Sequence, residues 1–428
     1  MVALPFVSMV VALLLGIPIA IALAGSGLLG LWIVTGDWNM VIGNLAMMPY
    51  GSAAQYVLTT IPMFILMAYL SASSGLARDL YSAGASWLAH IRGGLAVATV
   101  FACGVFGAMS GASFAAAAVM SKIAMPEMRR CGYSDELAAG AIGIGATLDI
   151  LIPPSIAMVI YGLYTNTSIG KLLIAGIVPG IIVGIFLCLA IFVWVFVRPS
   201  HAPQTYRASW AERFTSLRRT WPSLLLILIV LTLLYTGVVT PTEVGAIGAF
   251  LAAVIGVAMS RLTWKDAVGA FKGTIRTSAM VFLILVGANI FGNYMALSEV
   301  PQHLAKAIAA MNLNRWVVIG GIVVIYFLVS MFMDEIPLLL LTLQVTFPLI
   351  MALGFDPIWF GVISMLMISM GLVFPPVGLV AFVVSGTAGV DLVKVYTGTS
   401  ILMIATVLTI VLLMFFPQIA LWLPATMR

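Results

Sequence analysis

The chain has 428 residues, of which 63% are hydrophobic and only 8% are charged, and its mean hydropathy is +1.19. A soluble core of this length cannot bury so much apolar surface, so the composition excludes a soluble globular protein. The formal net charge of +5 does not indicate nucleic-acid binding, because the basic residues lie in short segments between apolar runs and therefore report membrane topology. Strand-like alternation of polarity is absent, and we expect an all-α polytopic membrane protein.

Apolar runs of spanning length recur along the chain, and the first extends from Leu4 to Val34. It has no preceding basic residues and no clear cleavage pattern, so we expect a retained first span rather than a removed signal peptide. With the interrupted runs included, the sequence predicts roughly ten to twelve crossings or half-crossings. The cysteines are too scattered for a disulfide framework or a metal cluster, and we interpret all three as packing residues: Cys103, Cys131 and Cys188.

The segment at about 105–128 is rich in small residues and does not resemble one continuous lipid-facing helix. Ser110, Gly111 and Ser113 lie around its expected tip. We interpret the segment as a re-entrant hairpin. For the two serines, close helix packing through small residues is the alternative interpretation.

A predicted helix at about 137–165 carries Pro153 and Pro154 within the apolar stretch "TLDILIPPSIAMVIYG". Proline removes a backbone N–H and clashes with the preceding turn, so the helix must break there. Polar groups freed inside lipid persist only where protein, water or a bound ion satisfies them. We therefore predict a discontinuous helix whose ends bind an ion or a substrate, with Ser155 capping its second half. An ordinary proline kink is the alternative, and Asp149 could hold a cation or accept from a local backbone donor.

Two basic segments predict the cytoplasmic side. The linker 198–220 contains five Arg and one Glu, and the segment 261–276 contains four Lys or Arg and one Asp. By the positive-inside rule we expect both to be cytoplasmic loops.

Two charged residues lie near span ends. Glu243, in "TPTEVG", is expected to cap a helix rather than to bind a ligand. Arg276 could reach an anionic substrate, although a snorkelling interfacial anchor is the favoured role.

The chain contains an internal repeat. One offset of 222 positions (348−126) relates four pairs of helix-breaking residues: Pro126 and Pro348, Gly132 and Gly354, Pro153 and Pro375, Pro154 and Pro376. This spacing predicts two repeats, 1–197 and 221–428, on either side of the linker. The second repeat then has its own hairpin at about 330–351 and its own broken helix at about 358–386. That hairpin holds Asp334, Glu335 and Pro337, and for the acids we favour a functional role over a solvated span end.

Charge predicts that the two repeats have opposite topology. Residues 122–136 contain Lys122, Arg129 and Arg130, whereas the corresponding residues 344–358 contain no Lys or Arg. The first segment is therefore expected in the cytoplasm and the second outside it, with both chain termini periplasmic. Such inverted repeats place paired broken helices near the middle of the bilayer, where secondary transporters bind substrates and coupling ions.

Several motifs in order resemble one transporter family. They include "GASFAAAAVMSKIAMPEMRRCGYSDELAAGAIGIGATLDILIPPSIAMVIYG", "PTEVGAIGAF", "MDEIPLLLL", "GFDPIWFGV" and "GLVFPPVGLVAF". Over nearly the whole chain they are similar to the large membrane subunit of the tripartite ATP-independent periplasmic (TRAP) transporters, the DctM type. The resemblance implies a sodium-coupled, elevator-type importer of organic anions in the bacterial inner membrane.

The resemblance also implies where ligands bind. Its motifs map onto residues 110–113, 145–155, 334–337 and 371–378. The candidate sodium-binding residues are Ser110, Gly111, Gly145, Thr147, Asp149, Asp334, Glu335, Gly371 and Pro375. With Arg276 added for its charge, the candidate substrate-binding residues are Ser113, Pro153, Pro154, Ser155, Arg276, Pro376 and Gly378. Three positions depart from the family pattern, in which Gly is usual at Asp149, Thr at Phe374 and a polar residue near Met367.

The implied partners are a small four-helix membrane subunit, expected as a separate polypeptide, and a periplasmic binding protein that delivers a carboxylate or sulfonate. The closest rival function is a stand-alone ion-coupled anion carrier of related architecture that needs no binding protein. We expect no enzymatic activity and no cofactor besides Na⁺ as coupling ion. HExxH, GxSxG and phosphate-binding motifs are absent, and the three histidines are scattered: His90, His201 and His303.

Overall fold

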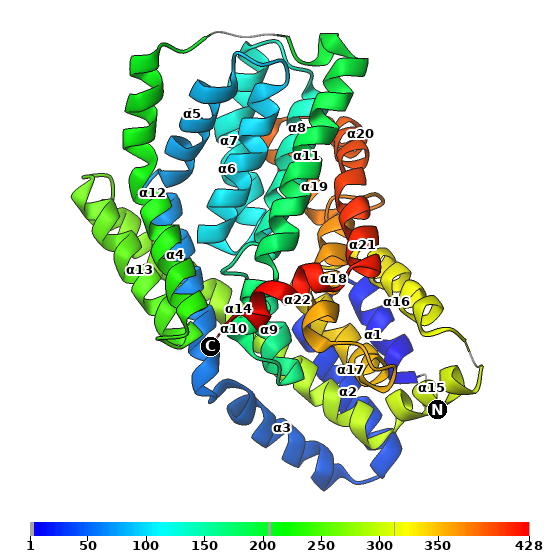
Figure 1. Ribbon diagram of the computed structural model, residues 1–428. Coiled ribbons are helices and arrows are strands. Elements are labelled where there is room, and N and C mark those ends of the chain that lie inside the picture. The colour runs from blue at the N-terminus through cyan, green and yellow to red at the C-terminus, as the bar shows by residue number, and fades with distance from the viewer. Residues whose placement is uncertain (1–3, 204–206, 312, 428) are drawn as a thin grey trace.

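The computed structural model describes residues 4–203, 207–311 and 313–427, and every regular element in these ranges is a helix (Figure 1). The elements before the linker are α1 (Leu4–Leu14), α2 (Ile19–Thr35), α3 (Trp38–Ala53), η1 (Tyr56–Thr59), α4 (Thr60–Ser73), α5 (Leu76–Leu88), α6 (Gly94–Ser110), α7 (Ser113–Arg130), α8 (Asp135–Ala146), η2 (Thr147–Ile150), α9 (Ile156–Thr165), α10 (Ile169–Ala175) and α11 (Ile177–Val197).

The linker contains the short turn η3 (Pro199–His201) and runs into the next helix. The remaining elements are α12 (Trp210–Thr236), α13 (Pro241–Ala258), α14 (Trp264–Leu297), α15 (Val300–Ala310), α16 (Arg315–Ser330), α17 (Glu335–Ala352), α18 (Pro357–Gly371), α19 (Leu379–Ala388), α20 (Leu392–Leu402), α21 (Ile404–Phe415) and α22 (Gln418–Ala425).

Capping boxes fix the starts of α13 and α14. The Thr240 hydroxyl accepts the Glu243 amide, and the Glu243 carboxylate accepts the Thr240 amide at 2.7 Å, so the predicted capping role of Glu243 is confirmed. Thr263 and Asp266 form the same motif at the start of α14. The expected loop 261–276 is therefore wrong, because the chain is helical from Trp264 onward.

The expected single first span is also wrong. The run from Leu4 to Val34 forms two helices, α1 and α2, which pack against each other. The chain turns between them at Gly16, whose φ of 78° lies in the left-handed region, and Pro18 follows directly before α2. Glycine reaches this conformation without strain and proline cannot continue the helix before it, so the pair ends α1.

Seven helices in the described part of the chain are long and apolar enough to cross a membrane: Tyr56–Ser73, Ile169–Val197, Trp210–Thr236, Pro241–Ala258, Trp264–Leu297, Glu335–Ala352 and Leu392–Phe415. Other apolar helices have 10–17 residues, among them α6, α9, α16, α18 and α19. Of these, α9, α18 and α19 belong to the predicted broken helices, so interruption accounts for their length. α6 overlaps the first predicted hairpin, and α16 ends where the second predicted hairpin begins, so both helix pairs start earlier than predicted.

Helices from the two halves pack reciprocally. α2 contacts α14, and α4 contacts α13. Under the offset of about 222 positions α2 corresponds to α13, and α4 corresponds to the second part of α14, so the two contacts are equivalent. The same holds for α7 with α19 and for α9 with α17. The hydroxyls of Thr60 and Thr242, 2.6 Å apart, join α4 to α13 inside this packing.

Small residues allow these close crossings. A Cβ at Gly27 would lie 2.8 Å from the Phe291 backbone, where α2 meets α14. A Cβ at Gly140 would lie 2.6 Å from the Gly398 backbone, where α8 meets α20. Neither position tolerates a larger residue without separating the helices, as is typical of membrane helix packing.

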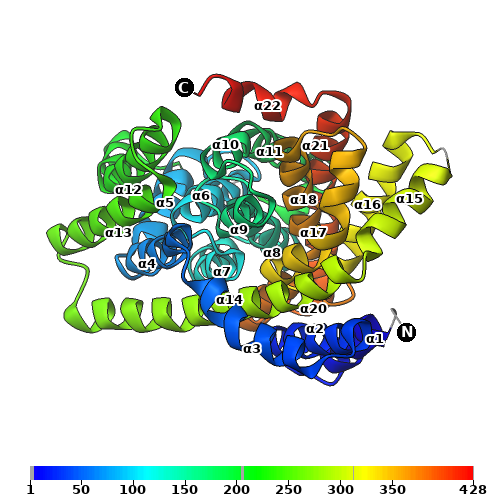
Figure 2. The same cartoon turned by 90° about the horizontal axis from the view of Figure 1, so that it is seen from below.

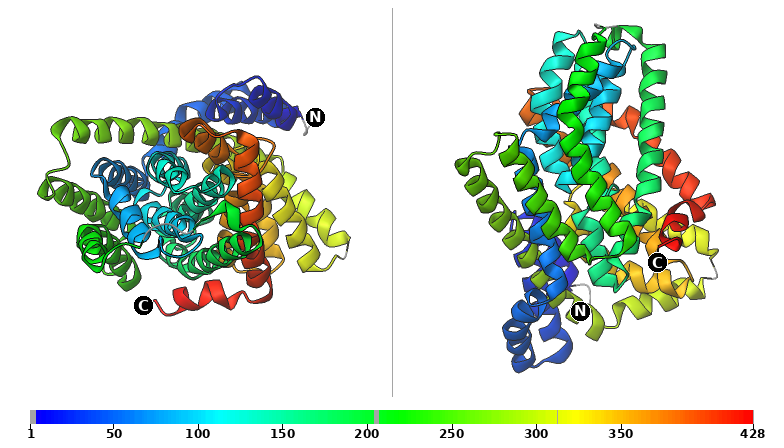
Figure 3. Two further views of the ribbon diagram at one scale, coloured as in Figure 1. Left: turned by 90° about the horizontal axis from the view of Figure 1, so that it is seen from above. Right: turned by 60° about the vertical axis from the view of Figure 1, so that its left-hand side comes forward.

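The outline of the molecule separates a central group of helices from flanking ones. Figure 2 shows the central helices, including α6, α8 and α9, end-on, with α12 and α13 at one side and the long α14 along another. Figure 3 shows the same arrangement from the opposite end. The end of α11 and the start of α12 lie at the top of Figure 1, whereas α1 and α22 lie in the lower half.

Candidate functional site

The helix expected at about 137–165 is interrupted in the structure. α8 ends at Ala146, the turn η2 follows, and α9 begins at Ile156. Pro153 and Pro154 lie inside the gap and are buried. The Ser155 hydroxyl accepts the Met158 amide at 3.4 Å, which confirms its predicted role as the cap of the second half-helix.

The turn between α6 and α7 packs against the gap between α8 and α9. We call residues 110–113 the first tip. Gly111 has a φ of 57°, and a Cβ there would lie 2.9 Å from the Pro154 carbonyl oxygen. Glycine is therefore needed at this position for two reasons: it adopts the left-handed conformation without strain, and it has no Cβ to separate the two backbones. The helix pair α6–α7 and the broken helix α8–α9 form one packed unit.

A side-chain hydrogen bond completes the contact. The Ser113 hydroxyl donates to the Asp149 carboxylate at 2.6 Å, and both residues are buried. Asp149 also lies against Gly107, where a Cβ would come within 2.6 Å of the Asp149 Cβ. The carboxylate has the Ile150 amide beside it. Asp149 thus has a local backbone neighbour, as one sequence interpretation allowed, and a partner from the helix pair as well.

The second half repeats the arrangement with different residues. α18 ends at Gly371 and α19 begins at Leu379, and we call residues 331–334, between α16 and α17, the second tip. The Gly378 amide donates to the Met331 carbonyl at 3.0 Å. A Cβ at Gly371 would overlap the Ser330 hydroxyl and lie 2.6 Å from the Ser330 Cβ. The second helix pair therefore packs directly onto the second break.

In each half a larger side chain packs against a glycine where the broken helix meets the helix pair, but the two halves place the larger side chain on different elements. Asp149 and Gly371 differ by 222 positions, as do Ser113 and Glu335. In the first half the broken helix supplies the side chain, Asp149, against a glycine of the helix pair. In the second half the helix pair supplies Ser330 against Gly371. Asp149 thus places a carboxylate where the second half, at Gly371, has only a hydrogen atom.

Two further acids begin α17. The Asp334 carboxylate accepts the Glu335 amide at 2.8 Å and caps the helix. Glu335 is 6% exposed, and its Oε2 is buried with no hydrogen-bond partner among the described residues. Asp149, Asp334 and Glu335 are near enough for their charges to interact. Acidic side chains from both halves of the chain are therefore close enough to influence one another.

The described residues contain no group of three or more His, Cys, Asp or Glu side chains able to hold a metal ion. A cation at the three acids would therefore need carbonyl and hydroxyl oxygens in addition. Such oxygens are available at the C-terminal ends of α6, α8, α16 and α18, which all stop at a tip or a break.

Other predicted residues have separate environments. Gly145 packs against Cys103 of α6, and the Thr147 hydroxyl donates to the Ile144 carbonyl at 2.9 Å. Pro375 is half-buried and Pro376 is exposed. Arg276 is exposed on α14. The structure thus brings Gly111 against Pro154 and Ser113 against Asp149, whereas Gly145, Thr147 and Arg276 have other neighbours or are exposed.

Sequence reasoning missed Gly107 and Ser330. Neither carries a charge or a break, so neither has a local signal. Applying the 222-residue offset to Asp149 leads to Gly371, but the packing of Ser330 against Gly371 depends on the tertiary arrangement.

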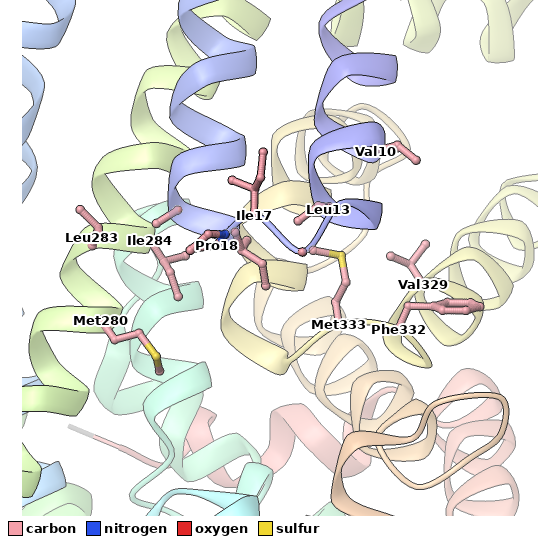
Figure 4. A pocket seen from close by; sticks show the side chains of 13 residues that line it. Val10, Leu13, Ile17, Pro18, Met280, Leu283, Ile284, Val329, Phe332 and Met333 are labelled. Carbon is pink, nitrogen blue, oxygen red and sulfur yellow. The ribbon is translucent and has the colours of Figure 1, made fainter. Parts of the chain in front are cut away.

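A large cavity lies beside the second tip. It has a volume of about 630 Å³ and is apolar (Figure 4). Its walls come from α1, α2, α14 and the second helix pair, and include Leu13, Pro18, Met280, Phe332 and Met333. None of the described residues that line it is charged. The cavity suits apolar contact rather than ion binding.

Two interrupted helices, each held by the tip of a helix pair and embedded in a doubled set of apolar helices, define a membrane transporter of the broken-helix class. The family model of the tripartite ATP-independent periplasmic transporter, DctM component, matches residues 6–419. The chain therefore belongs to the DctM family.

Individual relatives agree with this assignment. The chain is 33% identical over 384 residues to the C4-dicarboxylate TRAP transporter large permease protein DctM of Pseudomonas aeruginosa, covering 90% of each chain. It is 32% identical over 418 residues to the ectoine TRAP transporter large permease protein TeaC of Halomonas elongata, covering 97% of each. The crystal structure of the Alcanivorax borkumensis YdaH transporter has the same fold, with a TM-score of 0.64, 16% identity, and coverage of 91% of this chain and 89% of that one.

Proposed function

We propose that this chain is the large membrane subunit of a sodium-coupled secondary-active importer, which moves a small organic anion delivered by a periplasmic binding protein. The observation that carries the proposal is the pair of breaks, each with a tip packed on it, in a chain of the DctM family. The proposal extends the family assignment to an ion, a substrate class and a direction of transport.

Helix ends support the choice of ligands. The C-terminal ends of α6 and α8 and the carboxylates Asp149, Asp334 and Glu335 supply oxygens for Na⁺. The N-terminal ends of α7 and α9 carry partial positive charge and favour an anion. At the first tip, C-terminal helix ends thus favour the cation and N-terminal helix ends favour the anion. Transport energy would come from the sodium gradient, since the sequence has no phosphate-binding motif.

We further propose that residues 1–197 and 221–428 are inverted repeats joined by a cytoplasmic linker, and that both hairpins are re-entrant. The reciprocal contacts of α2 with α14 and of α4 with α13 support the doubling. An elevator motion would carry the broken helices and hairpins past the flanking helices α4, α13 and α14. In this arrangement both termini are periplasmic and the chain lies in the bacterial inner membrane.

Relatives support the partners and the substrate class. The family name describes a tripartite periplasmic transporter, which fits a small membrane subunit and a soluble binding protein as partners. The two relatives above are named for a C4-dicarboxylate and for ectoine, and both compounds carry a carboxylate. A small carboxylate or sulfonate is therefore the substrate class we propose.

Reconstitution tests the proposal. Proteoliposomes containing this chain, its small subunit and a loaded binding protein should accumulate labelled anion only under an inward sodium gradient. Removing either partner should abolish uptake. Robust uptake by this chain alone would instead favour a stand-alone carrier, and uptake that ignores sodium would exclude sodium coupling.

A further inference from the structure

A small cavity of about 170 Å³ lies at the first tip, between the helix pair and the flanking helices. Its walls are mainly apolar and belong to α4, α6, α7, α9 and α14. The lining includes Ile65, Ala68, Phe106, Val119, Ile156 and Thr277. The cavity therefore sits between the part of the molecule that we propose to move and the part that we propose to stay fixed.

Two helices begin at this cavity. Ala112 and Ala115, from the start of α7, and Ile156, the first residue of α9, all line it. Ala112 offers no side-chain acceptor, and α7 has no side-chain cap among the described residues. The Ser113 hydroxyl is directed to Asp149 instead. The uncapped amides of α7 and the positive end of its dipole are therefore available to an anion.

A buried hydroxyl is a second indication that a polar ligand binds in this cavity. Ser110 lines the cavity and is 2% exposed, and its Oγ has no hydrogen-bond partner among the described residues. Buried hydroxyls are normally paired, so an unpaired one in a cavity wall indicates a partner that binds there. The other two hydroxyls that line the cavity, those of Tyr69 and Thr277, are 3.0 Å apart and bond each other.

The charge and size of the site limit the ligand. Among the described residues no Lys, Arg or His lines the cavity, so the positive group it offers is a helix end, which suits one negative charge better than two. A cavity of about 150 Å³ is known to hold benzene, so this one accepts a single ring or a short branched chain. Phe106, Ile65 and Val119 provide apolar contact for such a body.

We propose that the cavity at the first tip binds a small monocarboxylate with an apolar body, oriented by the α7 N-terminus and the Ser110 hydroxyl. This inference rests on the proposed anion import and narrows its substrate. The proposed substrate differs from the C4-dicarboxylate for which one relative in the same family is named.

The test uses the complete three-component complex in proteoliposomes, with labelled 2-oxoisovalerate, benzoate, succinate and N-acetylneuraminate as probes. Sodium-driven uptake is expected for the two monocarboxylates, and at least tenfold less for succinate and N-acetylneuraminate. Preferred uptake of succinate or N-acetylneuraminate would overturn the monocarboxylate inference and leave sodium-driven anion import intact. If no probe enters under a sodium gradient, both proposals fail.

Variants then assign the preference to this chain, because the binding protein is unchanged. Measured at saturating sodium, so that a sodium-binding role of Ser110 does not contribute, Ser110→Ala should raise the KM for 2-oxoisovalerate about tenfold, as expected for losing a hydrogen bond to a charged group. Ser121→Ala is the matched control, since Ser121 is also buried with an unpartnered Oγ but does not line the cavity. Ala115→Leu should fill the cavity and reduce benzoate uptake more than 2-oxoisovalerate uptake. Equal effects of the two serine variants, or an unchanged probe ratio in Ala115→Leu, would overturn the site.

Discussion

The hydroxyl of Ser113 and the carboxylate of Asp149 are 2.6 Å apart, and this bond joins the first helix pair to the first break. Both residues are 1% exposed, so solvent does not compete for the bond. Ser113 corresponds to Glu335 in the second half, which lies near enough to Asp149 for their charges to interact. The Asp149 carboxylate therefore accepts one hydrogen bond and also lies within electrostatic reach of two other acids, Asp334 and Glu335, and a bound cation would relieve their repulsion.

Asp149→Asn tests the role of this carboxylate in sodium binding. The substitution keeps the shape and removes the charge, so the sodium concentration for half-maximal uptake should rise about tenfold or more, equivalent to about 1.4 kcal/mol. Ser113→Ala should produce a smaller rise, and the double variant less than the sum of both, because the two residues share one interaction. Sodium titrations of uptake provide the measurement. A parent-like titration for Asp149→Asn would rule out a sodium role for Asp149.

Replacing the first proline pair tests the break itself. Ala is favoured over Pro in a helix interior by about 3 kcal/mol per position, so Pro153→Ala with Pro154→Ala should extend α8 or α9 into the gap and withdraw its carbonyls. Sodium affinity should then fall. The matched change at Pro375 and Pro376, which are more exposed, should have a smaller effect. If transport persists with an unchanged sodium dependence in the first variant, the prolines form only a kink.

Gly371→Ala should loosen the second tip. Its Cβ would overlap Ser330, and overpacking of this kind typically costs about 1–3 kcal/mol. Gly386→Ala is the control, because a Cβ there meets nothing within 4 Å and alanine favours the helix. Thermal denaturation in detergent should show a lower midpoint for the first variant and no loss for the second. Equal midpoints would contradict the close packing of Ser330 on Gly371.

Cysteine labelling tests the inverted topology. In a background with Cys131→Ser, Arg130→Cys should react with an impermeant thiol reagent only from the cytoplasm, and Asp356→Cys only from the periplasm. The prediction rests on the positive-inside rule, since residues 344–358 carry no Lys or Arg. Labelling of both positions from the same side would exclude inverted repeats.

A pH series tests the ion pair at the α7–α8 turn. Arg129 donates to Asp135 at 2.7 Å and also bonds the Ala388 and Gly389 carbonyls, so it links the first half to the end of α19. The hydrogen bond from Arg129 lowers the pKa of Asp135 below its ordinary value of 3.8. Because the pKa of Asp135 is lower in the folded state, the ion pair stabilises the protein fully at pH values above the ordinary pKa of 3.8. This stabilisation is lost as the pH falls through the pKa of the folded state.

The measurement compares the parent with Asp135→Asn. The difference in thermal midpoint should be constant from pH 8 to about 5 and should shrink only below about pH 4. A difference that already disappears near pH 6 would mean that another group controls the contact.

Helix breaks were predictable from the sequence because proline and glycine act locally. Pro153 and Pro154 located the first gap, and the 222-residue offset located the second. The turn at Gly16 has the same kind of local signal, but a long apolar run concealed it. The partners of Asp149 and Gly371 were not predictable, because Ser113 and Ser330 lie on other helices and their contacts depend on how the helix pairs dock.

The reciprocal packing of α4 with α13 also has a consequence for synthesis of the chain. Thr60 and Thr242, which meet at 2.6 Å, are separated by 182 residues. At a synthesis rate of about 5–20 residues per second, roughly 10 to 40 seconds pass between the synthesis of α4 and the synthesis of its partner α13. During that interval the face of α4 that α13 covers in the finished molecule is exposed to the insertion machinery or to lipid. The contact between the two halves therefore forms only after the second half has been synthesised.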